Sequence, residues 1–238
     1  MRADRKIFFS PGLGALLFIL SIIGLCCGRK APPPVVAPSL NAPSKAAPVL
    51  SDEEAVKRIS LDRDVLAMIR KESREPFSPL NGWSPDGEQV EAPGVILPIE
   101  GQDVEQLVEK MREPLQKKGY QPYITDVAGE KVKCLTLVKD TDPYAILGIM
   151  QTNGVNCDIT NEKITEKLMA WQVRFPMVIL GAGQDWVEVK FRKLPSSMDA
   201  FAKEVYEFCP DCVDQGCGSV EALACEIKKT GKLFLWWD

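Results

Sequence analysis

The chain has 238 residues, of which 45% are hydrophobic and 26% charged, a composition typical of a globular protein. It contains no histidine, which excludes Ser-His-Asp and Cys-His catalysis and any zinc site with histidine ligands. The first fifty residues hold six of the 29 Lys and Arg side chains and one of the 33 Asp and Glu side chains, so the remainder carries 23 positive and 32 negative side chains. This acidic balance argues against nucleic-acid binding, and we expect no nucleic-acid partner.

The N-terminus has the pattern of an export signal. Three basic residues within the first six positions precede an uncharged run of 21 residues that ends at Cys26 and Cys27. This run resembles a bacterial lipoprotein signal, and either cysteine is a candidate for lipidation: Leu25 is larger than usual before Cys26, and Gly24 replaces the expected aliphatic residue before Cys27. The alternatives are an uncleaved membrane anchor, because 21 uncharged residues can span a bilayer, and ordinary cleaved secretion. All three place the rest of the chain outside the cytoplasm, in the cell envelope.

A proline-rich spacer follows this leader. Residues 29–50 contain six of the eighteen prolines, a density that favours an extended, semi-rigid chain and cannot bury a core. We therefore divide the chain into a leader or membrane anchor at 1–28, a linker at 29–50, an accessory helix and loop at 51–89, and a folded domain at 90–238.

Hydrophobic periodicity and capping residues predict the elements of the folded part in chain order. A helix begins at the capping box formed by Ser51 and Glu54 and stops by Pro76, and a turn-rich connection follows it. The remaining predicted helices lie at about 103–119, 142–154, 160–171, 196–208 and 219–229. A buried strand is predicted at 131–139, a strand-turn-strand unit at 175–191, and a final strand, apolar on both faces and therefore central, at 232–238.

These elements do not follow a strict βαβ order, so we expect an α+β fold: a single domain with a mixed β-sheet flanked by helices. Gly181 and Gly183 lie between two predicted strands. Because a phosphate-binding loop opens a helix, we expect no nucleotide site there, and no other cofactor is indicated.

The C-terminal part resembles an uncharacterised, mostly bacterial family, domain of unknown function 4253 (DUF4253). The resemblance covers roughly residues 95–238 and depends on Trp171, Gly181, residues 194–211, Gly216 and the terminal LWWD that ends in Asp238. It implies a shared fold and no particular activity. Cys209 belongs to the family pattern, whereas Cys212, Cys217 and Cys225 depart from it.

Four cysteines between Cys209 and Cys225 are disulfide candidates, because six cysteines in an exported chain form an even set. We favour one disulfide from Cys225 to Cys212 or Cys217. Their spacing fits neither a zinc ribbon nor a ferredoxin, so no metal site is predicted. A redox role for the Cys209-Pro210-Asp211-Cys212 stretch is a weaker alternative, since Cys209 follows a helix and the helix dipole there disfavours a thiolate.

Carboxylates and tryptophans near the C-terminus form the predicted binding site, namely Asp211, Asp214, Trp236, Trp237 and Asp238. No catalytic residue is assigned. We expect a membrane-tethered, non-enzymatic domain that binds a protein or another envelope partner. The main alternative is a carboxylate-dependent hydrolase acting on an envelope substrate, for which Asp211 and Asp238 would have to share a cleft. A cysteine-based metal or redox protein is the weaker alternative.

Overall fold

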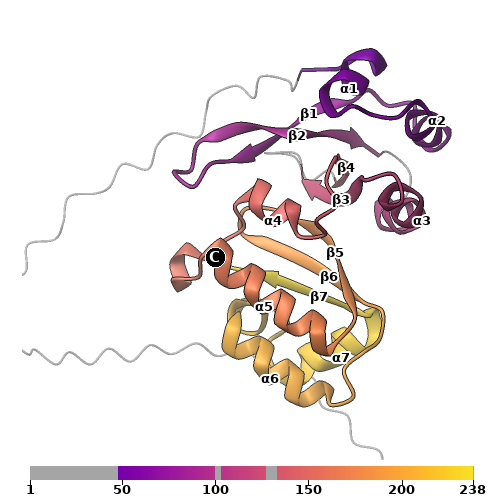
Figure 1. Ribbon diagram of the computed structural model, residues 1–238. Coiled ribbons are helices and arrows are strands. Elements are labelled where there is room, and N and C mark those ends of the chain that lie inside the picture. Colours follow the sequence, from indigo (N-terminus) through magenta and orange to yellow (C-terminus); the bar gives the residue numbers. More distant parts are fainter. Residues whose placement is uncertain (1–47, 100–102, 127–132, 238) are drawn as a thin grey trace, which may run out of the picture. The chain divides into compact units, whose positions relative to one another are not determined.

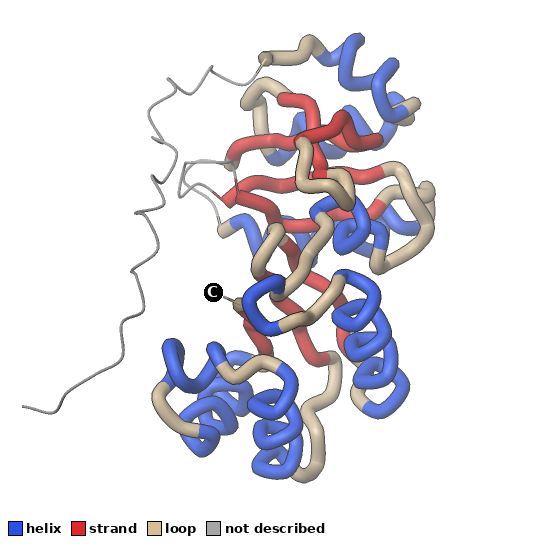
Figure 2. The backbone as a smooth tube through the Cα atoms, turned by 90° about the vertical axis from the view of Figure 1, so that its left-hand side faces the viewer, coloured by secondary structure: helices blue, strands red, loops and turns tan. Residues whose placement is uncertain are grey.

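The computed structural model describes residues 48–99, 103–126 and 133–237, which lie in one compact unit from Ser44 to Asp238. Seven strands form one twisted sheet, shown in Figure 2, in the order β1-β2-β4-β3-β5-β6-β7. The strands are β1 (Ser78–Trp83), β2 (Gln89–Pro98), β3 (Gln121–Asp126), β4 (Lys133–Val138), β5 (Met177–Ala182), β6 (Trp186–Phe191) and β7 (Lys232–Trp236). All neighbours pair antiparallel except β3 and β5, so the sheet is mixed, as predicted.

Helices cover both faces of this sheet (Figure 1). On one face lie α1 (Asp52–Ile59), α2 (Arg63–Glu72) and α3 (Val104–Gln116), and on the other lie α4 (Ala145–Met150), α5 (Asn161–Arg174), α6 (Met198–Phe208) and α7 (Val220–Thr230). Two short turns complete the described elements: the 3₁₀ turn η1 (Val155–Cys157) and the π-helical turn η2 (Cys212–Cys217).

Strand residues alternate between two hydrophobic clusters, one on each face, because successive side chains of a strand point to opposite sides. Tyr123 packs in the cluster under α4–α7, and its neighbour Ile124 packs in the cluster under α1–α3. Trp171 in the first cluster is fully buried, and its ring packs edge to face against Phe201 with the ring centroids 5.2 Å apart. The predicted α+β domain is thus confirmed.

The N-terminal part of the described chain differs from the prediction. The single helix expected from Ser51 is two helices, because Ser60 adopts a left-handed conformation (φ 47°) that ends α1. The expected accessory helix and loop at 51–89 instead contribute β1 to the sheet, and α1 and α2 to a core cluster. The capping box of Ser51 and Glu54 is present.

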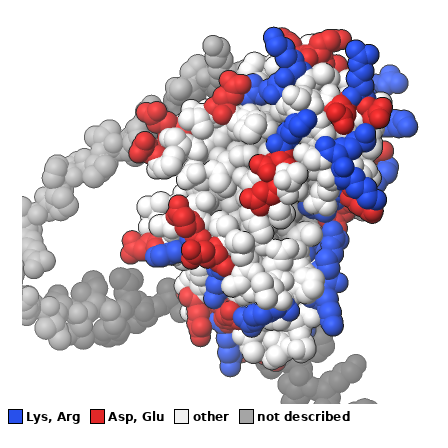
Figure 3. Space-filling view, viewed as in Figure 1, with Lys and Arg blue, Asp and Glu red and all other residues white. Residues whose placement is uncertain are grey.

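The last strand also differs from the prediction, because β7 is an edge strand and pairs only with β6. Leu233 and Leu235 are buried, whereas Phe234 between them is 48% exposed. No described helix is long and apolar enough to cross a membrane. The face of the molecule in Figure 3 carries acidic and basic side chains intermingled, without a continuous basic patch.

Candidate functional site

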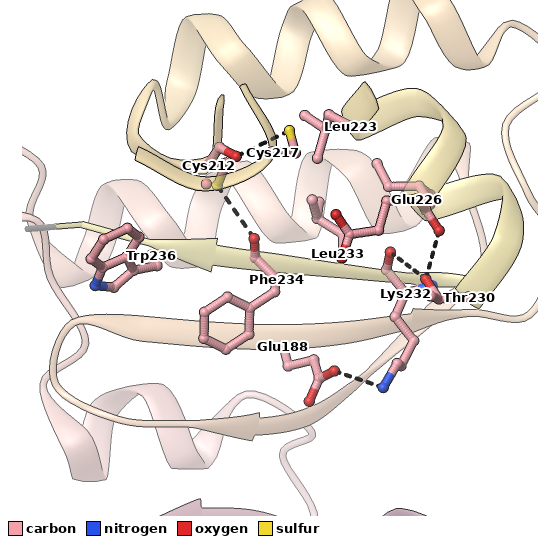
Figure 4. A pocket seen from close by; sticks show the side chains of 12 residues that line it. Glu188, Cys212, Cys217, Leu223, Glu226, Thr230, Lys232, Leu233, Phe234 and Trp236 are labelled. Atoms are coloured by element: carbon pink, nitrogen blue, oxygen red, sulfur yellow. Dashed lines mark hydrogen bonds and ion pairs between the residues drawn. The ribbon is translucent and has the colours of Figure 1, made fainter. Parts of the chain in front are cut away.

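A cavity of about 450 Å³ lies beside the edge strand β7 (Figure 4). Four elements line it: β7, its neighbour β6, helix α7 and the turn η2. Its lining residues are Glu188, Cys212, Gly216, Cys217, Leu223, Glu226, Ile227, Thr230, Lys232, Leu233, Phe234 and Trp236. The volume falls within the roughly 300–1,000 Å³ typical of ligand pockets, so this cavity is the candidate functional site.

Aromatic rings form one side of the site. The exposed ring of Phe234 stacks on Trp186 with a centroid distance of 5.6 Å and an interplanar angle of 21°. Trp236 is paired with Trp186 across the two strands and therefore lies on the same face as both rings. Leu223, Ile227 and Leu233 also line the cavity. Leu233 is buried and, one step from Phe234 along β7, points to the opposite face of the sheet, so the aliphatic and aromatic side chains reach the cavity from opposite sides of the edge strand.

Charged side chains form one end of the site. Lys232 Nζ lies 3.0 Å from the carboxylate of Glu188 and 2.7 Å from that of Glu105, and Figure 4 shows the first of these pairs. Burial alone would lower the pKa of Lys232, but its hydrogen bonds to Glu105 and Glu188 outweigh burial and raise that pKa. The exposed Glu226 adds a second carboxylate to the cavity lining, so acidic groups outnumber Lys232 there.

Two thiols cover the outer edge of β7. Gly231 O accepts from the N–H of Phe191 in β6, and the N–H of Trp237 donates to Asp185 O just before β6. The main-chain groups of Phe234 and Trp236 lie an odd number of residues from these two and therefore point away from β6. Cys209 Sγ donates to Trp236 O at 3.0 Å, and Cys212 Sγ donates to Phe234 O at 3.3 Å. The side chains of η2 therefore satisfy carbonyls that an exposed sheet edge would leave to water.

The predicted binding residues do not converge on this site. The carboxylate of Asp211, just before η2, accepts a hydrogen bond from Gln215 at 3.1 Å, and Asp214 accepts one from the Tyr206 hydroxyl at 3.2 Å. Neither of these aspartates lines the cavity, whereas Trp236 does. Trp237 is buried in the core against Phe208, and its indole N–H has no hydrogen-bond partner among the described residues.

Several predicted residues lie outside the described residues, namely Cys26, Cys27 and Asp238. The described cysteines form no disulfide with one another, and the Sγ atoms of Cys209 and Cys212 lie 3.1 Å apart. Cys225 is exposed on α7, so its pairing with Cys212 or Cys217 stays a prediction. Among the described residues, no group of three or more Cys, Asp or Glu side chains could hold a metal ion.

Most of the cavity lining, above all Phe234, Glu188 and Glu226, was not predicted from the sequence. The alternation of buried and exposed residues in β7 is the signal that could have identified Phe234. The positions of Glu188 and Glu226 depend on the β6–β7 register and on the packing of α7, for which the sequence has no local signal.

Comparison with known proteins identifies one family. Residues 134–238 match the model of a family described as a domain of unknown function, DUF4253, which agrees with the expected resemblance but begins within β4. No curated protein and no solved structure matches the chain.

Proposed function

We propose that this chain, whose residues 134–238 match the model of the DUF4253 family of unknown function, is a non-enzymatic binding protein of the cell envelope. Its ligand is a basic side chain, Lys or Arg, presented by a partner protein in the cavity beside β7. The family has no activity to transfer, so the proposal depends on the chemistry of the site.

The observation that carries the proposal is the exposed Phe234 ring beside an acidic cavity. A cation held over an aromatic face gains about 0.5–2 kcal/mol, and a nearby carboxylate adds a charge-assisted hydrogen bond. Glu226 supplies an exposed carboxylate, whereas Glu188 is already paired with Lys232, and the aliphatic lining suits the methylene stem of a long basic side chain. The cavity has room for a side chain and its neighbours, and not for a packed helix.

The charge of the folded part supports the same ligand class. Residues after position 50 carry 32 acidic and 23 basic side chains, so a basic partner would be attracted at long range. The envelope location is supported by the uncharged run that ends at Cys27 and by the proline-rich linker at 29–50, which would hold the domain away from a membrane.

The binding proposal is tested with full-length protein in detergent and two pentapeptides that differ only in a central arginine or citrulline. Citrulline has the shape of arginine without its charge, so we expect the arginine peptide to bind about 2- to 30-fold more tightly, the ratio that corresponds to about 0.5–2 kcal/mol. Quenching of tryptophan fluorescence measures binding, since Trp236 lines the cavity.

Variants locate the peptide in the cavity. Phe234→Leu and Glu226→Gln should each weaken arginine-peptide binding by a similar factor, whereas Glu221→Gln, an exposed carboxylate on α7 outside the lining, should not. Equal affinity for the two peptides would refute the proposal, and cleavage of either peptide would show an enzyme instead. Recovery of the protein in the soluble fraction of lysed cells, away from membranes, would contradict the envelope location.

A further inference from the structure

Two buried thiols lie in contact where α6 meets η2. Cys209 is the residue after α6, Cys212 is the first residue of η2, and their Sγ atoms are 3.1 Å apart. A disulfide has a sulfur-sulfur distance of about 2.05 Å, so an approach of about 1 Å would close the bond. No other pair of described cysteines has a sulfur-sulfur contact of this kind.

Only one of these thiols is within reach of a ligand. Cys212 lines the cavity and is 9% exposed, whereas Cys209 lies behind it and is fully buried. The half-buried Cys217 also lines the cavity, but its thiol donates to the carbonyls of Cys212 and Ser219. Of the contacting pair, Cys212 is therefore the thiol that the cavity reaches, with Cys209 behind it.

The hydrogen bond between the thiols makes their chemistry unequal. Cys212 donates its proton to Cys209 Sγ, which lowers the pKa of Cys209. The same bond, together with burial, raises the pKa of Cys212. The pKa of Cys209 is thus lower than that of Cys212, which suits Cys209 to the second step, the attack that closes the disulfide.

We propose that Cys209 and Cys212 form a redox-active dithiol that reduces disulfide-bearing molecules entering the cavity. Cys212 gives its proton to solvent and its Sγ attacks one substrate sulfur, while the other substrate sulfur leaves as a thiolate and is protonated by water. Cys209 then gives its proton to solvent, its Sγ attacks Cys212 Sγ, and the second substrate sulfur leaves as a thiolate and is protonated by water. The protein loses two protons and two electrons as one disulfide forms, and the substrate becomes two thiols.

Oxidation of the pair would change the hydrogen bonding at the edge of β7. The Cys209 thiol donates to Trp236 O, and the Cys212 thiol shares its one proton between Phe234 O and Cys209 Sγ, so a disulfide leaves both β7 carbonyls without these donors. These two residues also line the cavity. The fluorescence of Trp236 should therefore change when the dithiol is oxidised. This inference does not depend on the basic ligand proposed above.

The test treats the reduced full-length protein with 5,5′-dithiobis(2-nitrobenzoate), a small aromatic disulfide, and maps its peptides without reduction. In the wild type we expect a Cys209–Cys212 disulfide, with two thionitrobenzoates released by this pair and none retained. The Cys209→Ser variant should keep one thionitrobenzoate on Cys212, because no second thiol can displace it. The Cys212→Ser variant should leave Cys209 unmodified, because Cys209 is buried.

Cys225→Ser is the matched control, since it removes an exposed thiol outside the cavity and should leave the Cys209–Cys212 disulfide unchanged. A wild-type map in which Cys212 keeps its adduct, or in which Cys225 is joined to Cys212 or Cys217, would overturn the proposal. The wild-type map needs no variant to fold, and near-ultraviolet circular dichroism checks that the variants do.

Discussion

Gly181 lies where the two halves of the sheet meet, and its replacement by alanine tests whether β5 can approach β3 with a side chain between them. Ile124 pairs with Gly181 at the parallel β3–β5 junction, next to a bulge in β5. A Cβ at position 181 would overlap the carbonyl oxygen of Ile124. That atom belongs to the backbone of a buried strand, so the clash can be relieved only by moving β3 and β5 apart.

The expected magnitude follows from two opposing effects. Overpacking a buried site costs about 1–3 kcal/mol, and a backbone obstacle puts Gly181→Ala near the upper end. Alanine also lowers the conformational entropy of the unfolded chain, which stabilises the folded state by about 0.4–1 kcal/mol. We expect Gly181→Ala to lower the free energy of unfolding by about 2 kcal/mol, measured by urea unfolding followed by circular dichroism.

Gly148→Ala is the matched control for Gly181→Ala. Gly148 is an exposed residue inside α4, and a Cβ there would meet nothing within 4 Å. Alanine in a helix interior is favoured over glycine by about 0.5–1 kcal/mol, so this variant should be more stable than the wild type. If the two substitutions changed stability in the same direction, the account of the β3–β5 junction would be wrong.

Two further predictions concern the face of the sheet under α1–α3. The Glu109 carboxylate lies 3.0 Å from buried Arg112 and 2.6 Å from Arg192, so Glu109→Gln should cost about 1–3 kcal/mol in urea unfolding by leaving Arg112 without its charged partner. Burial raises the pKa of Glu109, but hydrogen bonds from Arg192 and Arg112 outweigh it and lower that pKa below its ordinary value of 4.5. Stability from Glu109 is therefore present above pH 4.5 and is lost as the pH falls through the lower folded pKa; an unchanged acid slope in Glu109→Gln would contradict this. The backbone of Ser60 at the end of α1 is in the left-handed conformation, which glycine adopts without the steric cost that a side chain adds. Ser60→Gly should therefore stabilise the fold by about 1 kcal/mol and raise the melting temperature, and a lowered melting temperature would contradict this.

Three helix caps were predictable from the sequence because they depend on a few neighbouring residues, whereas the helices predicted from 142 and 196 begin at Ala145 and Met198 without a side-chain cap. Ser51, Thr160 and Ser219 each cap the helix that they were expected to begin. The hairpin of β5 and β6 was also predictable, since two apolar runs flank a short glycine-containing turn.

The N-terminal strands were not predictable, because their residues are typical of turns. Pro79 and Gly82 both lie in β1, where an edge position and a bulge after Pro79 accommodate a residue without an N–H donor. Gly82 is needed there because a Cβ would overlap the main chain of Ile149 in α4. Only the fold shows why these breakers of regular structure occur within a strand.

The site was predictable only in part. Of the two tryptophans predicted for the binding site, Trp236 lines the cavity and Trp237 does not, because one step along a strand reverses the face. Gly154 packs directly against Trp237. Any other residue at position 154 would place its Cβ 2.7 Å from the indole ring, which is too close. The contact between Cys209 and Cys212 depends on the irregular turn η2, which no periodic pattern in the sequence indicates.

The single parallel pairing between β3 and β5 has a consequence for how the molecule opens. On one side of it, β1-β2-β4-β3 are joined by antiparallel ladders, and on the other side β5-β6-β7 form a second antiparallel set that is local in sequence. Cooperative units of native proteins often coincide with such local sets. Amide protons should therefore exchange with solvent in two blocks that meet at Ile124 and Gly181, and the block with β7 carries the cavity and the dithiol. A partner could thus slow exchange in one half of the sheet while the other half keeps its own rate.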